Sequence, residues 1–87
     1  MENLETVVTV KDYGNIVIRL KDVLEKRNIK RNTLATAIGT RFEVIDNWCD
    51  GKLEKIDADI LARICYALQC DVNEILGYEN STEPSGE

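Results

Sequence analysis

The 87-residue chain has no histidine, three cysteines and one proline. Without histidine it lacks the side chain that most often acts as a general base at neutral pH and most often binds metals. Cys49, Cys65 and Cys70 lack the Cys-x-x-Cys spacing of zinc sites, so we expect reduced, mostly buried thiols. No nucleophile elbow or phosphate-binding glycine loop is present. We therefore predict a protein without enzymatic activity, metal or cofactor.

Long apolar runs are also missing. None approaches the roughly 18 residues that a membrane-spanning helix needs. The N-terminus carries Glu2 and Glu5 and has no hydrophobic signal-peptide region, so we expect a cytoplasmic protein. The length and the 44% content of hydrophobic residues predict one domain with a single small core.

Basic residues are fewer than acidic ones, and the formal net charge of −5 is unusual for a protein that binds nucleic acid. The charge is unevenly distributed. Residues 26–55 include seven basic and four acidic side chains, a net of +3, whereas the rest of the chain has a net of −8. The middle of the chain is thus a basic segment, although solvated helix faces alone would give the same pattern.

The most informative stretch is the one around Gly39. Apolar residues recur at helical spacing on both sides of it, and each run ends at a glycine that can adopt a left-handed backbone, Gly39 or Gly51. The two runs consist of Leu34, Ala35 and Ile38, and of Val44, Ile45 and Trp48. This pattern predicts two short helices joined by a tight corner, with Thr40 or Arg41 opening the second.

The stretch resembles the Xre-like helix-turn-helix regulators, a family that includes the phage repressors and Cro. The matching residues are Leu34, Ala35, Gly39, Thr40, Ile45, Trp48 and Gly51. The similarity extends from about Ile16 to Tyr78, roughly two-thirds of the chain. It implies an all-α, five-helix repressor-like domain over residues 16–78. It also implies a sequence-specific transcriptional regulator that binds double-stranded DNA as a homodimer, with a recognition helix at about 42–49 in the major groove.

The N-terminal end of the chain is compatible with two arrangements. Residues 1–15 form an N-terminal extension in which the β-branched run Thr6–Val10 predicts a short strand. Residues 16–19 could pair with that strand as a hairpin or could enter a helix over 16–27 directly, with Asn15 as its N-cap. We expect the strand to cover an edge of the core, and a dimer contact is the alternative.

The C-terminal half predicts two more helices. Asp57 or Asp59 can cap the first, whose buried stripe includes Ile60, Ile64 and Leu68. Asp71 can cap a short final helix over 72–76, closed by Gly77. The remainder has no apolar periodicity, so we expect a disordered tail from about residue 79.

The resemblance assigns two groups of DNA-contacting residues. Contacts to the phosphate backbone would come from Lys30, Arg31, Asn32, Lys52 and Lys55. Bases would be read by Arg41, Phe42, Glu43 and Asn47. The chemistry is suitable, because arginine can pair with guanine, asparagine with adenine and glutamate with the cytosine amino group, while an apolar ring can contact the thymine methyl group.

Two features depart from what a DNA-binding relative would show. Many relatives join the first and third helices by an ion pair, but the corresponding residues here are Leu24 and Cys49, which predicts an apolar contact. The third helix also carries Glu43, Asp46 and Asp50, which a polyanion would repel. The alternative function is therefore a protein-interaction module that keeps this fold and binds another regulatory protein. The corner, the basic segment, Arg41 and Asn47 lead us to favour DNA binding.

Overall fold

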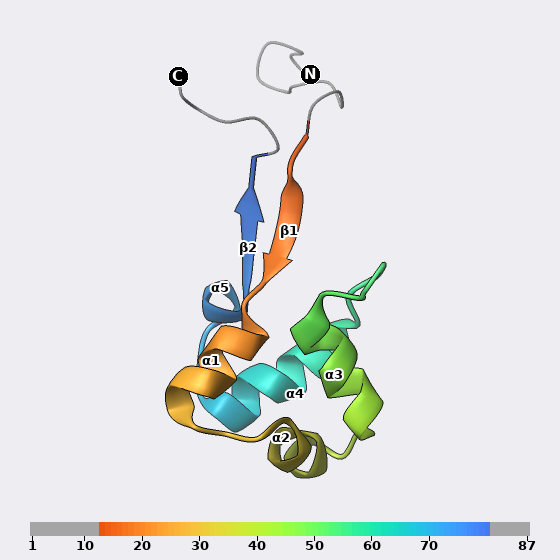
Figure 1. The fold of residues 1–87 in the computed structure, drawn as a ribbon, viewed down its shortest axis with the longest axis vertical. Coiled ribbons are helices and arrows are strands. Elements are labelled where there is room, and N and C mark those ends of the chain that lie inside the picture. Colours follow the sequence, from red (N-terminus) through yellow and green to blue (C-terminus); the bar gives the residue numbers. More distant parts are fainter. Residues whose placement is uncertain (1–12, 81–87) are drawn as a thin grey trace, which may run out of the picture.

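The computed structural model describes residues 13–80, and this part of the chain holds five helices and one two-stranded antiparallel sheet (Figure 1). In chain order the elements are β1 (Asn15–Ile18), α1 (Leu20–Arg27), α2 (Arg31–Ile38), α3 (Phe42–Asp50), α4 (Ala58–Leu68), α5 (Val72–Ile75) and β2 (Leu76–Glu79). The predicted five-helix, mainly α-helical architecture is confirmed. The strand predicted at Thr6–Val10 lies outside the described residues.

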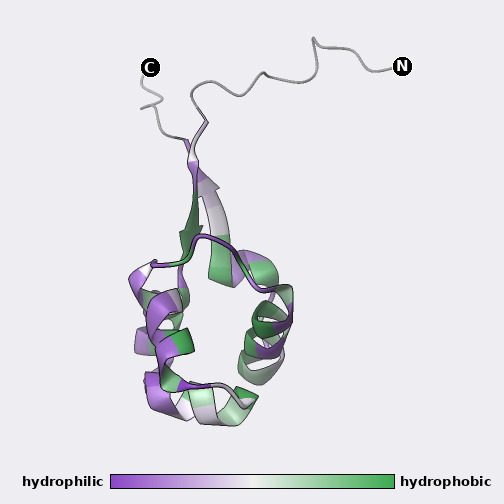
Figure 2. Cartoon of the chain, turned by 90° about the vertical axis from the view of Figure 1, so that its right-hand side faces the viewer, coloured by the Kyte–Doolittle hydropathy of each residue, from purple (hydrophilic) through white to green (hydrophobic). Residues whose placement is uncertain are grey.

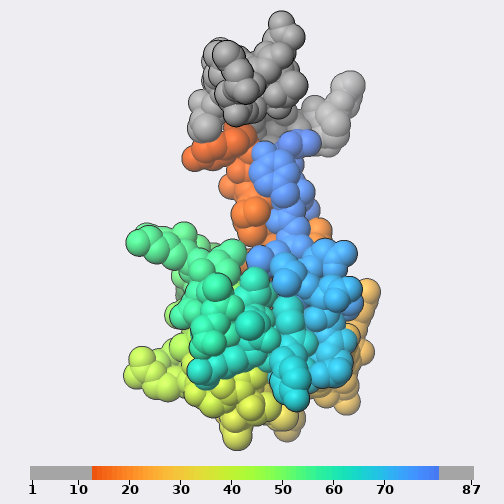
Figure 3. All heavy atoms as spheres, turned by 180° about the vertical axis from the view of Figure 1, so that it is seen from behind, coloured from red at the N-terminus to blue at the C-terminus, as the bar shows by residue number. Residues whose placement is uncertain are grey.

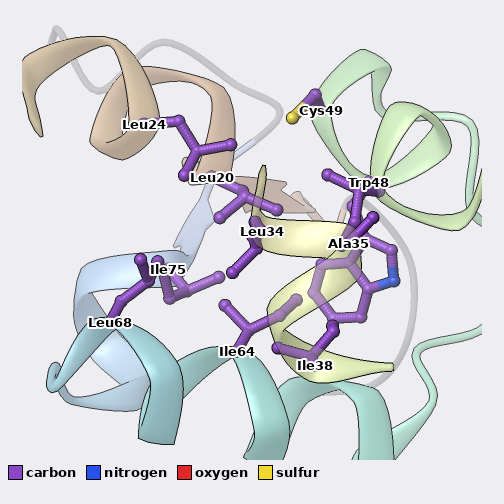
Figure 4. Packing of buried hydrophobic residues seen from close by; sticks show 11 residues of the cluster. Leu20, Leu24, Leu34, Ala35, Ile38, Trp48, Cys49, Ile64, Leu68 and Ile75 are labelled. Carbon is purple, nitrogen blue, oxygen red and sulfur yellow. The ribbon is translucent and has the colours of Figure 1, made fainter. Parts of the chain in front are cut away.

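The five helices surround one hydrophobic core, and we call this part the helical head (Figure 4). Its buried residues are Leu20, Leu24, Leu34, Ala35, Ile38, Ile45, Trp48, Cys49, Ile64, Leu68 and Ile75. Every helix contributes to this core, because each carries apolar residues at a spacing that places them on one face. Leu24 and Cys49 are both buried in it, as the sequence predicted.

Several helix ends lie where residues in the sequence favour them. Gly39 and Gly51 have φ values of +74° and +71°, and each ends its helix in the left-handed conformation, which glycine adopts without the steric cost of a Cβ. Asn28 ends α1 in the same way. The Asp57 carboxylate accepts hydrogen bonds from the backbone N–H groups of Asp59 and Ile60, at 2.9 and 3.2 Å, and so caps α4. Local sequence therefore sets where these helices begin and end.

The first helix begins later than its spacing predicted. Residues 15–18 form β1, so Asn15 is no N-cap but pairs with Glu79, and Arg19 takes the N-cap position of α1. The apolar spacing fits a helix from Ile16, but the β-branched residues of this segment pair with a strand from the other end of the chain. Of the two options that the sequence left open, direct entry into a helix at Ile16 is wrong.

The C-terminal boundary is also corrected. The last helix ends at Ile75, and Leu76–Glu79 form β2, so Glu79 belongs to the sheet rather than to a tail. Gly77 faces Val17 within the pairing and does not close a helix. We call the two paired strands the ribbon, and it projects from the helical head as a narrow stalk (Figures 1 and 3). Within residues 13–80, no helix combines the length and the apolar character that a membrane span requires.

Candidate nucleic-acid interface

The corner between α2 and α3 is held by backbone hydrogen bonds. The N–H of Thr40 donates to the carbonyl of Ala35 at 3.0 Å, and the N–H of Gly39 donates to that of Thr36 at 3.2 Å. Arg41 then adopts an extended backbone and serves as the N-cap residue of α3. Because Ile45 and Trp48 are fully buried, the face of α3 opposite to them is turned outward.

The four residues assigned to base reading all lie on that outward face and are exposed. Arg41, Phe42 and Glu43 meet at the N-terminal end of α3, and Asn47 follows about one turn later. The Arg41 side chain is 84% exposed, and its Nε lies 3.5 Å from Oε1 of Glu43. An ion pair between such exposed side chains contributes little to stability, so the side chains of Arg41 and Glu43 can both turn toward a ligand. Phe42 is 47% exposed, which is unusual for a phenylalanine and leaves its ring available for a contact.

Most of the residues assigned to phosphate contacts flank α3 and are exposed. Lys30 and Asn32 stand at the start of α2, and Lys52 and Lys55 lie in the connection after α3. Among the described residues, none of the three lysines forms an ion pair. Lys30 is the N-cap residue of α2 and provides no side-chain cap there. Their charges are therefore not neutralised within the described part of the protein.

Arg31 differs from these lysines. Its Nη1 donates to Oδ1 of Asp46 and lies 3.4 Å from Oδ1 of Asp50, so one guanidinium bridges α2 to two carboxylates of α3. The hydrogen bond that Arg31 donates to Asp46 raises the pKa of Arg31 above its ordinary value. Local patterns in the sequence do not reveal this contact, because its partners are 15 and 19 residues from Arg31, beyond the reach of helix spacing.

Three other arginines are bound to backbone carbonyls at helix ends. Arg19 donates to the carbonyls of Asn73 and Leu76, at 3.3 and 3.0 Å, and Arg63 donates to that of Ile38 at 3.0 Å. Arg27 donates to the carbonyl of Leu68. Cations at these positions satisfy acceptors that the helices leave open. Arg19, Arg27 and Arg63 thus connect separate elements of the fold. The exposed cations near α3 that make no such hydrogen bond within residues 13–80 are Arg41, Lys30, Lys52 and Lys55.

The three cysteines are free, and Cys49 lies in the core. Burial raises the pKa of the Cys49 thiol, and it does the same for Cys70 with a contribution from the neighbouring Cys65. Raised pKa values keep these thiols protonated and unreactive at neutral pH. Over residues 13–80, His, Cys, Asp and Glu side chains form no group of three that could hold a metal ion.

Two helices joined at a left-handed glycine, with the second anchored by Trp48 and polar on its outer face, define a repressor-type helix-turn-helix domain. The chain belongs to the family of Cro/C1-type helix-turn-helix DNA-binding domains, whose profile matches residues 19–81. The resemblance seen in the sequence is thereby confirmed.

Solved structures show the same fold. A candidate DNA-binding protein from Bacteroides fragilis aligns with a TM-score of 0.65 and 24% identity, over 72% of this chain and 100% of that one. The transcriptional regulator VanUg aligns with a TM-score of 0.65 and 23% identity, over 85% of this chain and 97% of that one. No curated protein matches the sequence. At these identities the structural likeness establishes the fold.

Proposed function

We propose that this protein is a sequence-specific DNA-binding transcriptional regulator that inserts α3 into the major groove. The observation that carries the proposal is the outward face at the N-terminal end of α3, where Arg41, Phe42 and Glu43 stand exposed above the buried Ile45 and Trp48. In helix-turn-helix proteins the N-terminal residues of the second helix meet the base edges. Membership of the Cro/C1-type family supports this role.

Each exposed residue on this face has a suitable partner in the major groove. Arg41 would donate two hydrogen bonds to guanine, and Asn47 would form a bidentate pair with adenine. Glu43 would accept from the amino group of cytosine, and Phe42 would contact a thymine methyl group. These contacts would determine which sequence is bound.

Affinity would come from the residues that flank α3. Lys30 and Asn32 at the start of α2, and Lys52 and Lys55 after α3, are exposed, and in this proposal they would contact phosphates on either side of the groove. Contacts of this kind fix the register of a protein on DNA without reading its sequence. The formal charge of −5 belongs to the whole chain, and on α3 Arg31 offsets part of the negative charge of Asp46 and Asp50.

A single head of this size makes few base contacts, so we propose that two copies bind half-sites one helical turn apart. Such a complex would contain two chains per duplex. Sedimentation of the protein with a duplex holding one or two half-sites would measure this stoichiometry. One chain on both duplexes would contradict the dimer and leave the docking of α3 unaffected.

The first experiment is fluorescence anisotropy with the DNA that lies upstream of the protein's own coding sequence and with a random duplex, at several salt concentrations. We expect one upstream fragment to bind more tightly than the random duplex, with an affinity that falls steeply as salt rises. The double variant Arg41→Ala/Asn47→Ala should lose the preference for that fragment while its circular dichroism stays native. A matched control, Lys21→Ala/Asn73→Ala, removes one cation and one amide elsewhere on the exposed surface and should retain the preference.

Two results would count against the proposal. Retention of sequence preference by Arg41→Ala/Asn47→Ala would show that α3 does not read the bases. Failure of the native protein to bind either duplex at low salt would contradict DNA binding itself and would favour the alternative of a protein-interaction module.

A further inference from the structure

The ion pairs of Arg31 place three charged groups beside the proposed DNA-binding face. The side chains of Arg31, Asp46 and Asp50 are 29%, 39% and 36% exposed, so the cluster lies at the surface and not in the core. It joins the first residue of α2 to the second half of α3. Any DNA that contacts the start of α2 and the outer face of α3 would lie close to all three groups.

The cluster contains Arg31, for which the family resemblance implies a contact to a DNA phosphate. If Arg31 left its partners for a phosphate, Asp46 and Asp50 would face the polyanion without a counter-charge. A guanidinium that donates to Asp46 and also lies beside Asp50 already satisfies part of its fork of donors. Lys30, the preceding residue, is exposed and forms no ion pair within the described residues, so it is better placed to take the phosphate.

We propose that Arg31 is a positioning residue, which stays bound to Asp46 and Asp50 in the DNA complex, holds α3 against α2 and offsets part of the negative charge of these two carboxylates. This inference rests on the proposed function and assigns a role within the same interface. It explains how an acidic recognition helix can approach DNA. The charge that α3 would present to the phosphates is reduced by a residue from the neighbouring helix.

The ion pairs of Arg31 with Asp46 and Asp50 can be tested without DNA. Four proteins form a cycle: the native chain, Arg31→Gln, Asp46→Asn/Asp50→Asn, and the variant with all three changes. We expect Arg31→Gln to lower Tm by a few degrees in the native background and to have almost no effect when both aspartates are already amides. Equal shifts of Tm in the two backgrounds would show that Arg31 is not coupled to Asp46 and Asp50, and would overturn the proposal.

The role in DNA binding is tested by the salt dependence of the affinity, because each phosphate contact contributes about 0.9 to the slope of log K against log salt. We expect Arg31→Gln to weaken binding roughly ten-fold without changing this slope. The matched control Lys30→Gln removes the neighbouring charge and should lower the slope by about 0.9. Adding Asp46→Asn and Asp50→Asn to Arg31→Gln should restore the affinity to within a few-fold of the native protein.

The outcomes separate three cases. A slope lowered by about 0.9 in Arg31→Gln would identify Arg31 as a phosphate ligand and overturn the proposal. An affinity that the two asparagines do not restore would show that the carboxylates are not what Arg31 offsets. If the native protein binds no DNA, the proposed function fails. The cycle of Tm values still decides whether Arg31 is coupled to Asp46 and Asp50.

Discussion

Leu20 and Ile16 are four residues apart, yet Leu20 is fully buried in the helical head and Ile16 is 56% exposed on the ribbon. The head contains every buried hydrophobic side chain of the described residues. The ribbon holds its strands through backbone pairing, the hydrogen bond from the Gly14 N–H to the Tyr78 hydroxyl and the contacts of Arg19 at its base. In Figure 2, β1 is hydrophobic over most of its length, and β2 changes from hydrophobic at the head to hydrophilic at its outer end.

The two regions are therefore stabilised by different means. Burial of apolar surface contributes about 25 cal/mol per Å², which makes the head the main source of stability. A two-stranded ribbon alone is at best marginally stable in water. We expect substitutions in the head to unfold the protein as a whole and substitutions in the ribbon to act locally.

The largest effect is expected from Leu20→Ala. This change removes a fully buried side chain and should lower the free energy of unfolding by about 2–5 kcal/mol. Ile16→Ala, four residues earlier on the exposed face of the ribbon, should lower the free energy of unfolding by less than about 1 kcal/mol. Urea denaturation followed by circular dichroism measures both. Similar costs would show that the ribbon supports the fold as strongly as the head does.

The next effect is expected at the outer end of the ribbon. A Cβ added at Gly14 would lie 1.8 Å from the carbonyl oxygen of Glu79, so Gly14→Ala must push the strands apart. The three atoms nearest to a Cβ added at Gly77 belong to the guanidinium of Arg19, the end of a flexible side chain and not backbone, although moving it would disturb its hydrogen bonds to Asn73 and Leu76. We expect Gly14→Ala to lower the stability of the ribbon by on the order of 1–3 kcal/mol, and Gly77→Ala to lower it by less.

Hydrogen exchange of the ribbon amides distinguishes the two glycine variants, since the outer pairs should lose protection in Gly14→Ala while the head amides keep theirs. Equal protection in both variants would mean that the strands accommodate the extra carbon, and would weaken the view that the ribbon depends on close backbone approach.

A smaller effect is expected from Tyr78→Phe. The Gly14 N–H donates to the Tyr78 hydroxyl at 2.7 Å, and its loss should reduce the local stability of the ribbon by about 0.5–1.5 kcal/mol. Tyr66→Phe is the matched control, because the Tyr66 side chain on α4 is 80% exposed. Exchange rates of the ribbon amides should rise in the first variant alone. A rise in neither would show that the hydroxyl contributes nothing to the pairing.

The smallest effect is expected from pH, and it should act on the head. Because burial raises the pKa of Cys49, the native state holds that proton more tightly than the unfolded state does. The resulting stability is complete below the ordinary thiol pKa of about 8.5 and is lost as pH rises above it. The urea midpoint should therefore fall between roughly pH 8 and 10, and less so in Cys49→Ala. An identical fall in both proteins would assign it to other groups.

Much of the head could be predicted from the sequence because its signals are local. The spacing of Leu34, Ile38, Ile45 and Trp48 predicted two helices and their buried faces, and Gly39 and Gly51 predicted where those helices end. The outward position of Arg41 and Asn47 followed from the same periodicity, whereas their contacts with bases stay predictions. The family assignment rests on this same stretch, and the match to the Cro/C1-type profile confirmed it.

The sequence by itself determined the two helices of the corner, their ends at Gly39 and Gly51 and most of the core, since hydrophobic periodicity and glycine conformation act within a few residues. Only the tertiary structure decided that residues 15–18 form a strand, because their partners at 76–79 come from the other end of the chain. It also decided the partners of Arg31, since Asp46 and Asp50 reach it only after α2 and α3 have packed. Pairings of this kind depend on how the helices fold onto one another, and no local pattern encodes them.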